Sequence, residues 1–330
     1  MNDIRSVLVT GGCGFIASNF LLYIVPKHRD IHFVNIDKID YCSTLKGLKK
    51  LENESNYSFY STDISNHSFI EYILNHHNID TIIHFAAQTH VDNSFGNSIS
   101  FTHDNVLGTH HLLEVVRLYK KVKRFIHVST DEVYGEVSMH EESDEKSILN
   151  PTNPYAASKA AVEFIVKSYS KSYGLPIIIT RGNNVYGPGQ YPEKLIPKFI
   201  LQLLENKPMT IHGNGNNIRN FVYIKDVVKA FEIILFHGKI NEIYNIGSAN
   251  EYSVLEIAKT LYSKFLLKTP FEQHITNVED RLFNDFRYCI NTSKLIKLGW
   301  KIETDFEKGL DETIEWYKNT YTDDYFVNKM

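Results

Sequence analysis

A tyrosine and a lysine four residues apart form the pair whose spacing most directly suggests chemistry. Tyr155 and Lys159 follow Asn153 and Pro154, which are typical of a helix N-cap and first turn, so the pair is predicted on one helix face. A nearby ammonium stabilises phenolate, and we therefore expect Lys159 to lower the pKa of Tyr155 and make it a usable base for a hydroxyl group. Such a pair also occurs by chance, so its meaning depends on its surroundings.

Three polar residues directly follow a predicted strand that ends at Ser129. They are Thr130, Asp131 and Glu132, and they would lie at the carboxyl edge of a parallel sheet, where ligands bind. Two adjacent carboxyls and a hydroxyl can supply an acid, a base and an orienting donor. An ordinary turn would explain either acid singly, but the coincidence with Tyr155 favours catalysis.

A glycine turn near the N-terminus indicates a nucleotide cofactor. Residues 7–17 read as strand, tight turn and helix, in which Gly11 permits the turn and Gly14 lets a pyrophosphate approach the helix N-terminus. Asp37 ends the second predicted strand, where a carboxylate can accept both ribose hydroxyls and would repel a 2′-phosphate. The predicted cofactor is therefore NAD rather than NADP, although a glycine turn or a strand-end acid can also be purely structural.

The elements that must position these residues alternate between short β-branched runs and longer helical patterns, as in βαβ units. Strands are predicted over 6–10, 31–36, 57–60, 81–85, 124–129 and 177–180. Helices are predicted over 15–25, where Pro26 ends the helix, and over 67–77, 100–119 and 154–173. The predicted fold class is α/β, a Rossmann doubly wound parallel sheet.

Length and a composition shift predict a second, smaller lobe. The chain has 330 residues, 43% of them hydrophobic and 22% charged, which is enough for a large core. A stretch rich in Gly, Pro and Asn at 182–192 breaks the βα rhythm before a helix predicted near 194–206. We expect residues 1–181 to bind the cofactor and carry the catalytic residues. Residues 182–330 are expected to form a mainly substrate-binding α/β lobe, with interleaved boundaries.

Charge, apolar runs and metal-ligand spacing exclude several classes of function. A net charge of −4 provides no basic field for a nucleic acid. The apolar runs are far shorter than the roughly 20 residues of a membrane span, and the N-terminus lacks a signal peptide, so a cytoplasmic protein is expected. The 3 cysteines and 15 histidines show no metal-ligand spacing, and no metal site is predicted.

Taken together, the motifs carry a family resemblance that covers nearly the whole chain. They are Gly11-x-x-Gly14-x-x-Ala17, His84-Phe-Ala-Ala-Gln-Thr-His-Val-Asp92, Thr130-Asp131-Glu132-Val-Tyr-Gly135, Tyr155-x-x-x-Lys159 and Arg181-Gly-Asn-Asn-Val-Tyr-Gly-Pro188. The chain resembles the extended short-chain dehydrogenases/reductases, and specifically the nucleotide-sugar 4,6-dehydratases. The pair Asp131 and Glu132 indicates the reaction class, because a 4-epimerase or decarboxylase of the same superfamily normally lacks it.

The resemblance implies a mechanism without net redox change. Tyr155, assisted by Lys159, takes the proton of the sugar 4-hydroxyl while C4 gives hydride to NAD, and Thr130 hydrogen-bonds the 4-oxygen. Glu132 then removes the C5 proton and Asp131 protonates the departing 6-hydroxyl, so that water leaves. Hydride returns to C6 and a proton to C5, and NAD is expected to stay bound through turnover.

Departures from the bacterial pattern favour UDP-glucose as the substrate. Thymidine-linked bacterial enzymes typically read Glu-Ser-His-Val-Asp-Arg and Gly-His-Asp-Arg-Arg-Tyr, where this chain has Gln88-Thr-His-Val-Asp-Asn93 and Phe283-Asn-Asp-Phe-Arg-Tyr288. With Asp40-Tyr-Cys-Ser43, these departures resemble the dehydratase domain of UDP-rhamnose synthases. The predicted product is UDP-4-keto-6-deoxyglucose, and the reaction would be the first step of UDP-rhamnose synthesis. The alternatives are dTDP-glucose as substrate, a nucleotide-sugar 4-epimerase, or a non-catalytic NAD-binding sensor.

The same resemblance carries over candidate binding residues. Cofactor candidates beyond those above are Phe15, Ile16, Lys38, Ser43, Asp63, Ile64, Phe85, Ala86, Ala87, Thr89 and Asn184, together with Tyr155 and Lys159. Substrate candidates are Gln88, Thr89, Thr130, Asn183, Glu193, Lys194, Arg219, Asn250, Arg281 and Tyr288. The two arginines suit diphosphate oxygens, because a guanidinium reads oxyanions with two hydrogen bonds. Core, turn, helix-cap and surface ion-pair roles remain the competing interpretations.

Two partners are expected from the resemblance alone. The family's usual homodimer would pack through the long helices near 100–119 and 154–173. Plant rhamnose synthases carry a further epimerase/reductase domain, whereas this chain ends at Met330, so a separate downstream enzyme is expected.

Overall fold

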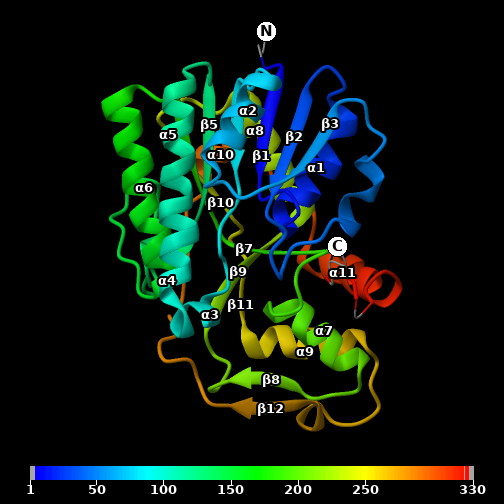
Figure 1. Cartoon of the computed structure of the whole chain (residues 1–330). Coiled ribbons are helices and arrows are strands. Elements are labelled where there is room, and N and C mark those ends of the chain that lie inside the picture. Colours follow the sequence, from blue (N-terminus) through cyan, green and yellow to red (C-terminus); the bar gives the residue numbers. More distant parts are fainter. Residues whose placement is uncertain (1–3, 323, 327–330) are drawn as a thin grey trace.

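The computed structural model describes residues 4–322 and 324–326 and shows a large sheet between helices, with a smaller lobe at one end (Figure 1). The sheet has seven strands in the order β10-β6-β5-β4-β1-β2-β3, and each neighbouring pair is parallel. Its strands are β1 (Ser6–Thr10), β2 (His32–Asp37), β3 (Tyr57–Ser61), β4 (Thr81–His84), β5 (Arg124–Thr130), β6 (Ile177–Gly182) and β10 (Ile243–Ile246). The strand order reverses between β1 and β4, which is where ligands bind in doubly wound sheets.

Helices cover both faces of this sheet. One face carries α1 (Phe15–Lys27) and α8 (Ile224–His237), which pack against each other, and the other carries α2 (His67–His76), α5 (Thr109–Tyr119) and α6 (Pro154–Tyr173). Along β1, Val7 and Val9 join the apolar core on the first face, while Leu8 joins the core on the second. This alternation follows from the two-residue period of a strand, and coverage of both faces explains why β1 is buried throughout.

Short elements connect these layers. They are η1 (Lys46–Leu51), α3 (Val91–Gly96), α4 (Ser98–Phe101), η2 (Thr102–Gly108) and η3 (Asp131–Tyr134). The 3-10 helix η3 begins directly after β5, so the polar residues there project from the carboxyl edge of the sheet.

The smaller lobe is built from later segments (Figure 1). Strands β7 (Asn184–Tyr186), β9 (Ile218–Tyr223) and β11 (Glu251–Ser253) form one sheet, and β8 (Met209–His212) pairs with β12 (Ile275–Val278) in another. Its helices are α7 (Leu195–Leu204), α9 (Val254–Lys264), η4 (Phe271–His274) and α11 (Phe306–Asn319), whereas α10 (Ser293–Ile296) packs against β10 of the large sheet. Since β10 and α8 also come from the range 182–330 yet belong to the main sheet layers, the chain crosses between the two parts more than once.

All the predicted strands are present, with ends shifted by at most two residues. Two helix predictions are wrong in detail. Pro26 does not end the first helix, which runs to Lys27, because a proline in the last turn removes only one bond while the His28 N–H still reaches the Ile24 carbonyl at 3.0 Å. The segment predicted as one helix over 100–119 begins at Ser98 and contains the π-helix η2.

Neither a membrane span nor a metal cluster is found in the part of the chain that the structure describes. No helix there is long and apolar enough to cross a bilayer. Over the same residues, no group of three or more His, Cys, Asp or Glu side chains is placed to hold a metal ion.

Candidate active site

One cavity at the carboxyl edge of the large sheet joins the predicted cofactor residues to the predicted catalytic residues. Its lining includes Gly11, Gly14, Phe15, Ile16, Asp37, Lys38, Ser43, Asp63, Ile64, Phe85, Ala86, Ala87, Gln88, Thr89, Thr130, Asp131, Glu132, Tyr155, Lys159, Asn183, Asn184, Glu193 and Lys194. These residues come from the ends of β1 to β6 and from the segments that follow them. The topology therefore gathers most of the predicted site from segments far apart in sequence.

The glycine turn has the geometry that a dinucleotide phosphate requires. Gly11 has φ +69°, and a Cβ there would lie 2.7 Å from the Ala86 Cα, so only glycine fits without a shift. Gly14 is the N-cap of α1, and no side chain of the described residues caps this helix. The helix N-terminus therefore faces the cavity with backbone amides suited to an oxyanion.

Asp37 lies where the ribose of a dinucleotide would be read. Its carboxylate accepts the Cys13 N–H at 2.9 Å and the Ile39 N–H at 2.6 Å. The residue is only 7% exposed, and this burial raises the pKa of the carboxyl against the effect of those hydrogen bonds. These residues fit NAD, since a fixed acceptor at the end of β2 suits ribose hydroxyls and opposes a 2′-phosphate.

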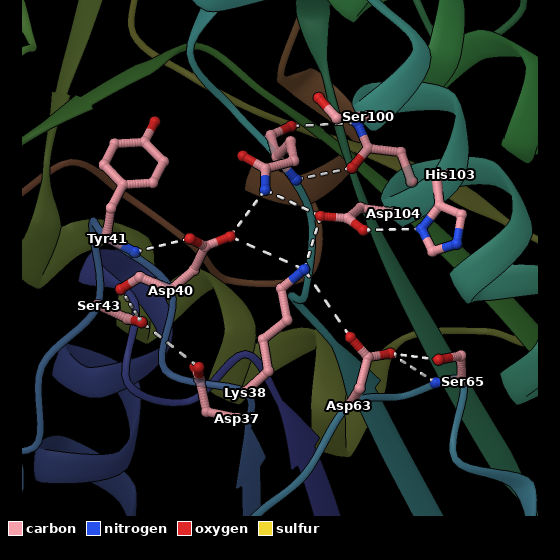
Figure 2. Close-up of polar contacts among 12 residues, drawn as sticks. Asp37, Lys38, Asp40, Tyr41, Ser43, Asp63, Ser65, Ser100, His103 and Asp104 are labelled. Carbon is pink, nitrogen blue, oxygen red and sulfur yellow. Dashed lines mark hydrogen bonds and ion pairs between the residues drawn. The ribbon is translucent and has the colours of Figure 1, made fainter. Parts of the chain in front are cut away.

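Further carboxylates surround Lys38 at the same end of the cavity. Figure 2 shows the Lys38 ammonium between the carboxylates of Asp40, Asp63 and Asp104. The Lys38 Nζ lies 2.7 Å from Asp104 and 3.8 Å from each of the other two. Burial opposes ionisation of Asp104, but hydrogen bonds from Lys38 and Gln88 outweigh it and lower its pKa. With Asp37 nearby, the excess of negative charge further favours NAD over NADP.

Gln88, predicted as a substrate residue, belongs to this carboxylate cluster. Its Nε2 donates to Asp40 Oδ2 and to Asp104 Oδ2, both at 2.9 Å, and its backbone N–H donates to Asn105 Oδ1 at 2.7 Å. Asn105 is buried in the π-helix η2 and also donates to Ser158 Oγ at 2.9 Å. The π-helix thus links the cofactor edge to α6, in line with the frequent occurrence of π turns at functional sites.

The predicted catalytic residues meet where β5 ends and α6 begins. Thr130 Oγ1 caps η3 by accepting the Glu132 N–H at 3.3 Å and donates to Asp131 Oδ1 at 3.2 Å. At the start of α6, Asn153 Oδ1 accepts the Ala156 N–H at 2.8 Å and Pro154 occupies the first turn. This cap starts the helix that carries Tyr155 and Lys159 into the cavity.

The expected lowering of the Tyr155 pKa by Lys159 is not found in the chain by itself. Burial, followed by the charge of Glu132, raises the pKa of Tyr155. The Lys159 Nζ donates to the Val128 carbonyl at 2.7 Å, and burial lowers the pKa of Lys159 to about 8. The prediction is wrong for the isolated chain because it considered the lysine and omitted burial and the neighbouring carboxyls.

The two adjacent acids have different partners. Asp131 is 3% exposed, and burial together with the charge of Glu132 raises its pKa to about 7. Its Oδ2 accepts the Asn183 Nδ2 at 2.6 Å, whereas Glu132 Oε2 accepts the Asn153 Nδ2 at 3.0 Å. Asn183, predicted to bind substrate, is therefore also a partner of Asp131. A carboxyl that titrates near neutrality suits a general acid.

The remaining substrate candidates fall into two groups. Lys194 donates from Nζ to the Thr89 carbonyl at 2.8 Å, on the cavity wall that also holds Glu193. Within the described part of the chain, the cavity lining does not include Arg219, Asn250, Arg281 and Tyr288.

Each residue outside the cavity lining has its own surroundings. The Arg219 guanidinium lies 4.7 Å from the ring centroid of Tyr288, and its charge still influences Asp131 and Glu132. Arg281 is paired with Asp92 at 2.6 Å, and Asn250 is exposed.

Sequence reasoning missed several residues that line the cavity. Among them are Asp40, Thr62, Asp104, His111, Thr180, Gln190 and Tyr191. Asp40 stands in a motif that already carried the resemblance, and Tyr191 directly precedes the Pro-Glu-Lys segment that supplied Glu193. Asp104 had no comparable signal, because the π-helix sets the direction of its side chain.

Comparisons with known proteins agree with this architecture. The sequence model of the family described as GDP-mannose 4,6 dehydratase matches residues 8–313. The chain belongs to this family. It is 49% identical over 315 residues to a trifunctional UDP-glucose 4,6-dehydratase, 3,5-epimerase and reductase of Arabidopsis thaliana, covering 95% of this chain and 47% of that protein. The chain thus spans about half the length of that relative.

Relatives that act on the thymidine nucleotide are similar to almost the same degree. A dTDP-D-glucose 4,6-dehydratase of Dictyostelium discoideum is 45% identical, with 98% of this chain and 84% of that protein covered. The crystal structure of a dTDP-glucose 4,6-dehydratase from Streptomyces venezuelae, with NAD and TYD bound, matches with a TM-score of 0.91 and 34% identity. It covers 96% of this chain and 98% of that one. The fold of this chain therefore matches that of solved nucleotide-sugar 4,6-dehydratases.

Proposed function

We propose that the chain is an NAD-dependent UDP-glucose 4,6-dehydratase that forms UDP-4-keto-6-deoxyglucose. The observation that carries the proposal is the single cavity in which Asp37 and the glycine turn lie at one end and the Thr130–Glu132 segment with Tyr155 at the other. The glycine turn and Asp37 would hold NAD, which would supply the hydride acceptor for oxidation at C4 and the hydride donor for reduction at C6. The smaller lobe would hold the nucleotide part of the substrate.

The residues at the end of β5 and the start of α6 divide the proton transfers. Tyr155 would take the proton of the 4-hydroxyl, with Lys159 beside it and Thr130 bonded to the 4-oxygen. Because burial and Glu132 oppose the phenolate, its formation in this site depends on added positive charge or on protonated neighbours. An oxidised nicotinamide bound in the cavity would supply such a positive charge.

The carboxyl pair would carry out the elimination. Once C4 is a ketone, Glu132 would remove the C5 proton while Asp131 donates a proton to the leaving 6-hydroxyl, so the C6–O bond breaks and water departs. Glu132 would return its proton to C5 as hydride reaches C6. The proton gained by Tyr155 and the proton lost by Asp131 balance through solvent, so the net change is the loss of one water.

Sequence motifs are the reason for proposing UDP-glucose rather than dTDP-glucose as the substrate. Asp40-Tyr-Cys-Ser43 and Gln88-Thr-His-Val-Asp-Asn93 resemble the UDP-rhamnose synthase type. The second candidate is dTDP-glucose. The identity to a dTDP-glucose enzyme, 45%, is close to the 49% identity to the UDP-glucose enzyme.

Incubation of the protein with UDP-glucose and with dTDP-glucose separately, without added NAD, tests both the proposed reaction and the proposed substrate. Mass spectrometry should record the loss of one water, faster from UDP-glucose than from dTDP-glucose. A preference for dTDP-glucose would overturn the substrate, and full dehydration by a Glu132→Gln variant would overturn the mechanism.

A further inference from the structure

One buried amide connects two parts of the candidate catalytic centre. Asn153 is 6% exposed, and its Oδ1 accepts the Ala156 N–H at 2.8 Å, which caps α6. The same side chain donates from Nδ2 to Glu132 Oε2 at 3.0 Å. A serine or aspartate would suffice as an N-cap, so the donation to Glu132 is the part of the arrangement that asparagine adds.

The donation restricts the rotamers of the Glu132 side chain. Glu132 lies in the short helix η3, and a glutamate loses substantial rotamer entropy when it is held in one orientation. Tyr155 stands two residues after Asn153 in the first turn of α6, so the same amide sets the start of the helix that carries the tyrosine. The neighbouring Asp131 is held separately, by Asn183 at 2.6 Å.

We infer that Asn153 is a positioning residue. It holds the Glu132 carboxylate toward the sugar C5 and at the same time fixes the first turn of the helix that carries Tyr155. The inference rests on the proposed function, in which Glu132 is the C5 base. Loss of the amide should therefore slow the elimination and leave the preceding C4 oxidation largely intact. A residue that served only as a helix cap would affect stability and would not separate the two steps.

Two replacements separate capping from positioning. Asn153→Ser and Asn153→Asp both keep a good N-cap, but serine lacks the amide donor and aspartate places a carboxylate against Glu132. Asn66→Ser is the matched control, because Asn66 caps α2 by accepting the Phe69 N–H and does not line the cavity. The Tm of Asn153→Ser and of Asn66→Ser should stay close to that of the parent chain.

Single-turnover kinetics in D₂O give the decisive measurement. In Asn153→Ser, absorbance at 340 nm should rise as in the parent chain and then persist, while deuterium incorporation at C5 slows. We expect kcat to fall about 10- to 100-fold with KM within about threefold, a part of the roughly 10²–10⁴-fold that a general base contributes. Asn153→Asp should be slower still. Equal slowing of oxidation and exchange, or an unchanged kcat, would overturn the inference.

A readout without turnover separates this inference from the proposed function. In ¹³C-labelled protein, the carboxyl of Glu132 should titrate at higher pH in Asn153→Ser, since the lost hydrogen bond favours the charged form. The other titratable groups coupled to Glu132 by charge stay in place: Asp131, Tyr155, Lys194, Arg219, Asp285 and Tyr288. If the parent chain dehydrates no sugar nucleotide, the proposed function fails, and an unshifted Glu132 would show independently that Asn153 does not act on this carboxyl.

Discussion

At the scale of the residue, Asp131 and Glu132 are adjacent in sequence, yet each is held by a different element. Asp131 bonds to Asn183 beyond the end of β6, and Glu132 bonds to Asn153 at the start of α6. Environments that hold two carboxyls differently allow one to donate a proton and the other to accept one. The assignment of acid to Asp131 leads to a pH dependence.

The dehydration rate should fall as pH rises through about 7, because Asp131 has a pKa raised to about 7 and must be protonated to donate. The Asp131→Asn substitution should lower the dehydration rate about 10²–10⁴-fold. An unfolded aspartate ionises near pH 4, so the raised folded pKa means that stability falls as pH rises from about 4 to 7. The Asp131→Asn variant, whose amide carries no charge, should therefore have a higher Tm than the parent chain at pH 8. A kcat that is flat from pH 6 to 9 would contradict the assignment.

A second residue-scale prediction concerns Gln88, whose amide donates to Asp40 and Asp104. Gln88→Glu would bring a third carboxylate to two others and should weaken cofactor retention at least tenfold, and Asp40→Asn in the same chain should restore part of it. NAD remaining per chain after desalting measures the effect. Gln273→Glu, at an exposed position, is the control. Equal retention in Gln88→Glu and the parent chain would show that the cluster does not hold the cofactor edge.

At the scale of the elements, a buried ion pair holds α6 against β6 close to the proposed catalytic residues. Arg181 donates to Glu163 from Nε at 3.0 Å and from a terminal nitrogen at 2.6 Å, and both side chains are at most 1% exposed. The guanidinium also lies 4.6 Å from the ring centroid of Tyr134 in η3. The pair therefore ties β6 to η3, which supplies the two carboxyls, and to α6, which supplies the tyrosine.

Breaking this pair on one side should be costly. Arg181→Met leaves the Glu163 charge buried without its main partner, and we expect a loss of about 3–5 kcal/mol in the free energy of unfolding by urea. Glu163→Leu combined with Arg181→Met should recover most of that loss, because no buried charge remains. A loss below about 1 kcal/mol in the single variant would mean that water or Lys167 compensates.

At the scale of the whole molecule, apolar side chains are exposed along the helices at one side of the sheet. Leu107 in η2, Leu118 in α5 and Phe164 in α6 are 46%, 64% and 62% exposed. The helices α5 and α6 pack side by side at the left of Figure 1. We propose that this face is the interface of a homodimer, since exposed apolar residues on adjacent helices suit a self-complementary interface.

Charged replacements on this face test the assembly. Leu107→Glu combined with Phe164→Glu should convert a dimer of the parent chain to a monomer in light scattering after size exclusion, because two carboxylates would be desolvated in the interface. Leu266→Glu, at an 85% exposed residue of the smaller lobe, should leave the mass unchanged. A double variant that stays dimeric would place the interface elsewhere.

The sequence by itself determined the strands of the sheet up to β6, the glycine turn, the acid at the end of β2 and the two candidate catalytic motifs. These features follow from periodicity and from residue types at short spacing, which are local properties. Only the tertiary structure decided that Gln88 bonds to Asp40, that Asn153 bonds to Glu132 and that the pKa of Tyr155 is raised. Those partners lie 48 and 21 residues apart, and the pKa depends on burial, so each arises only when separate segments come together.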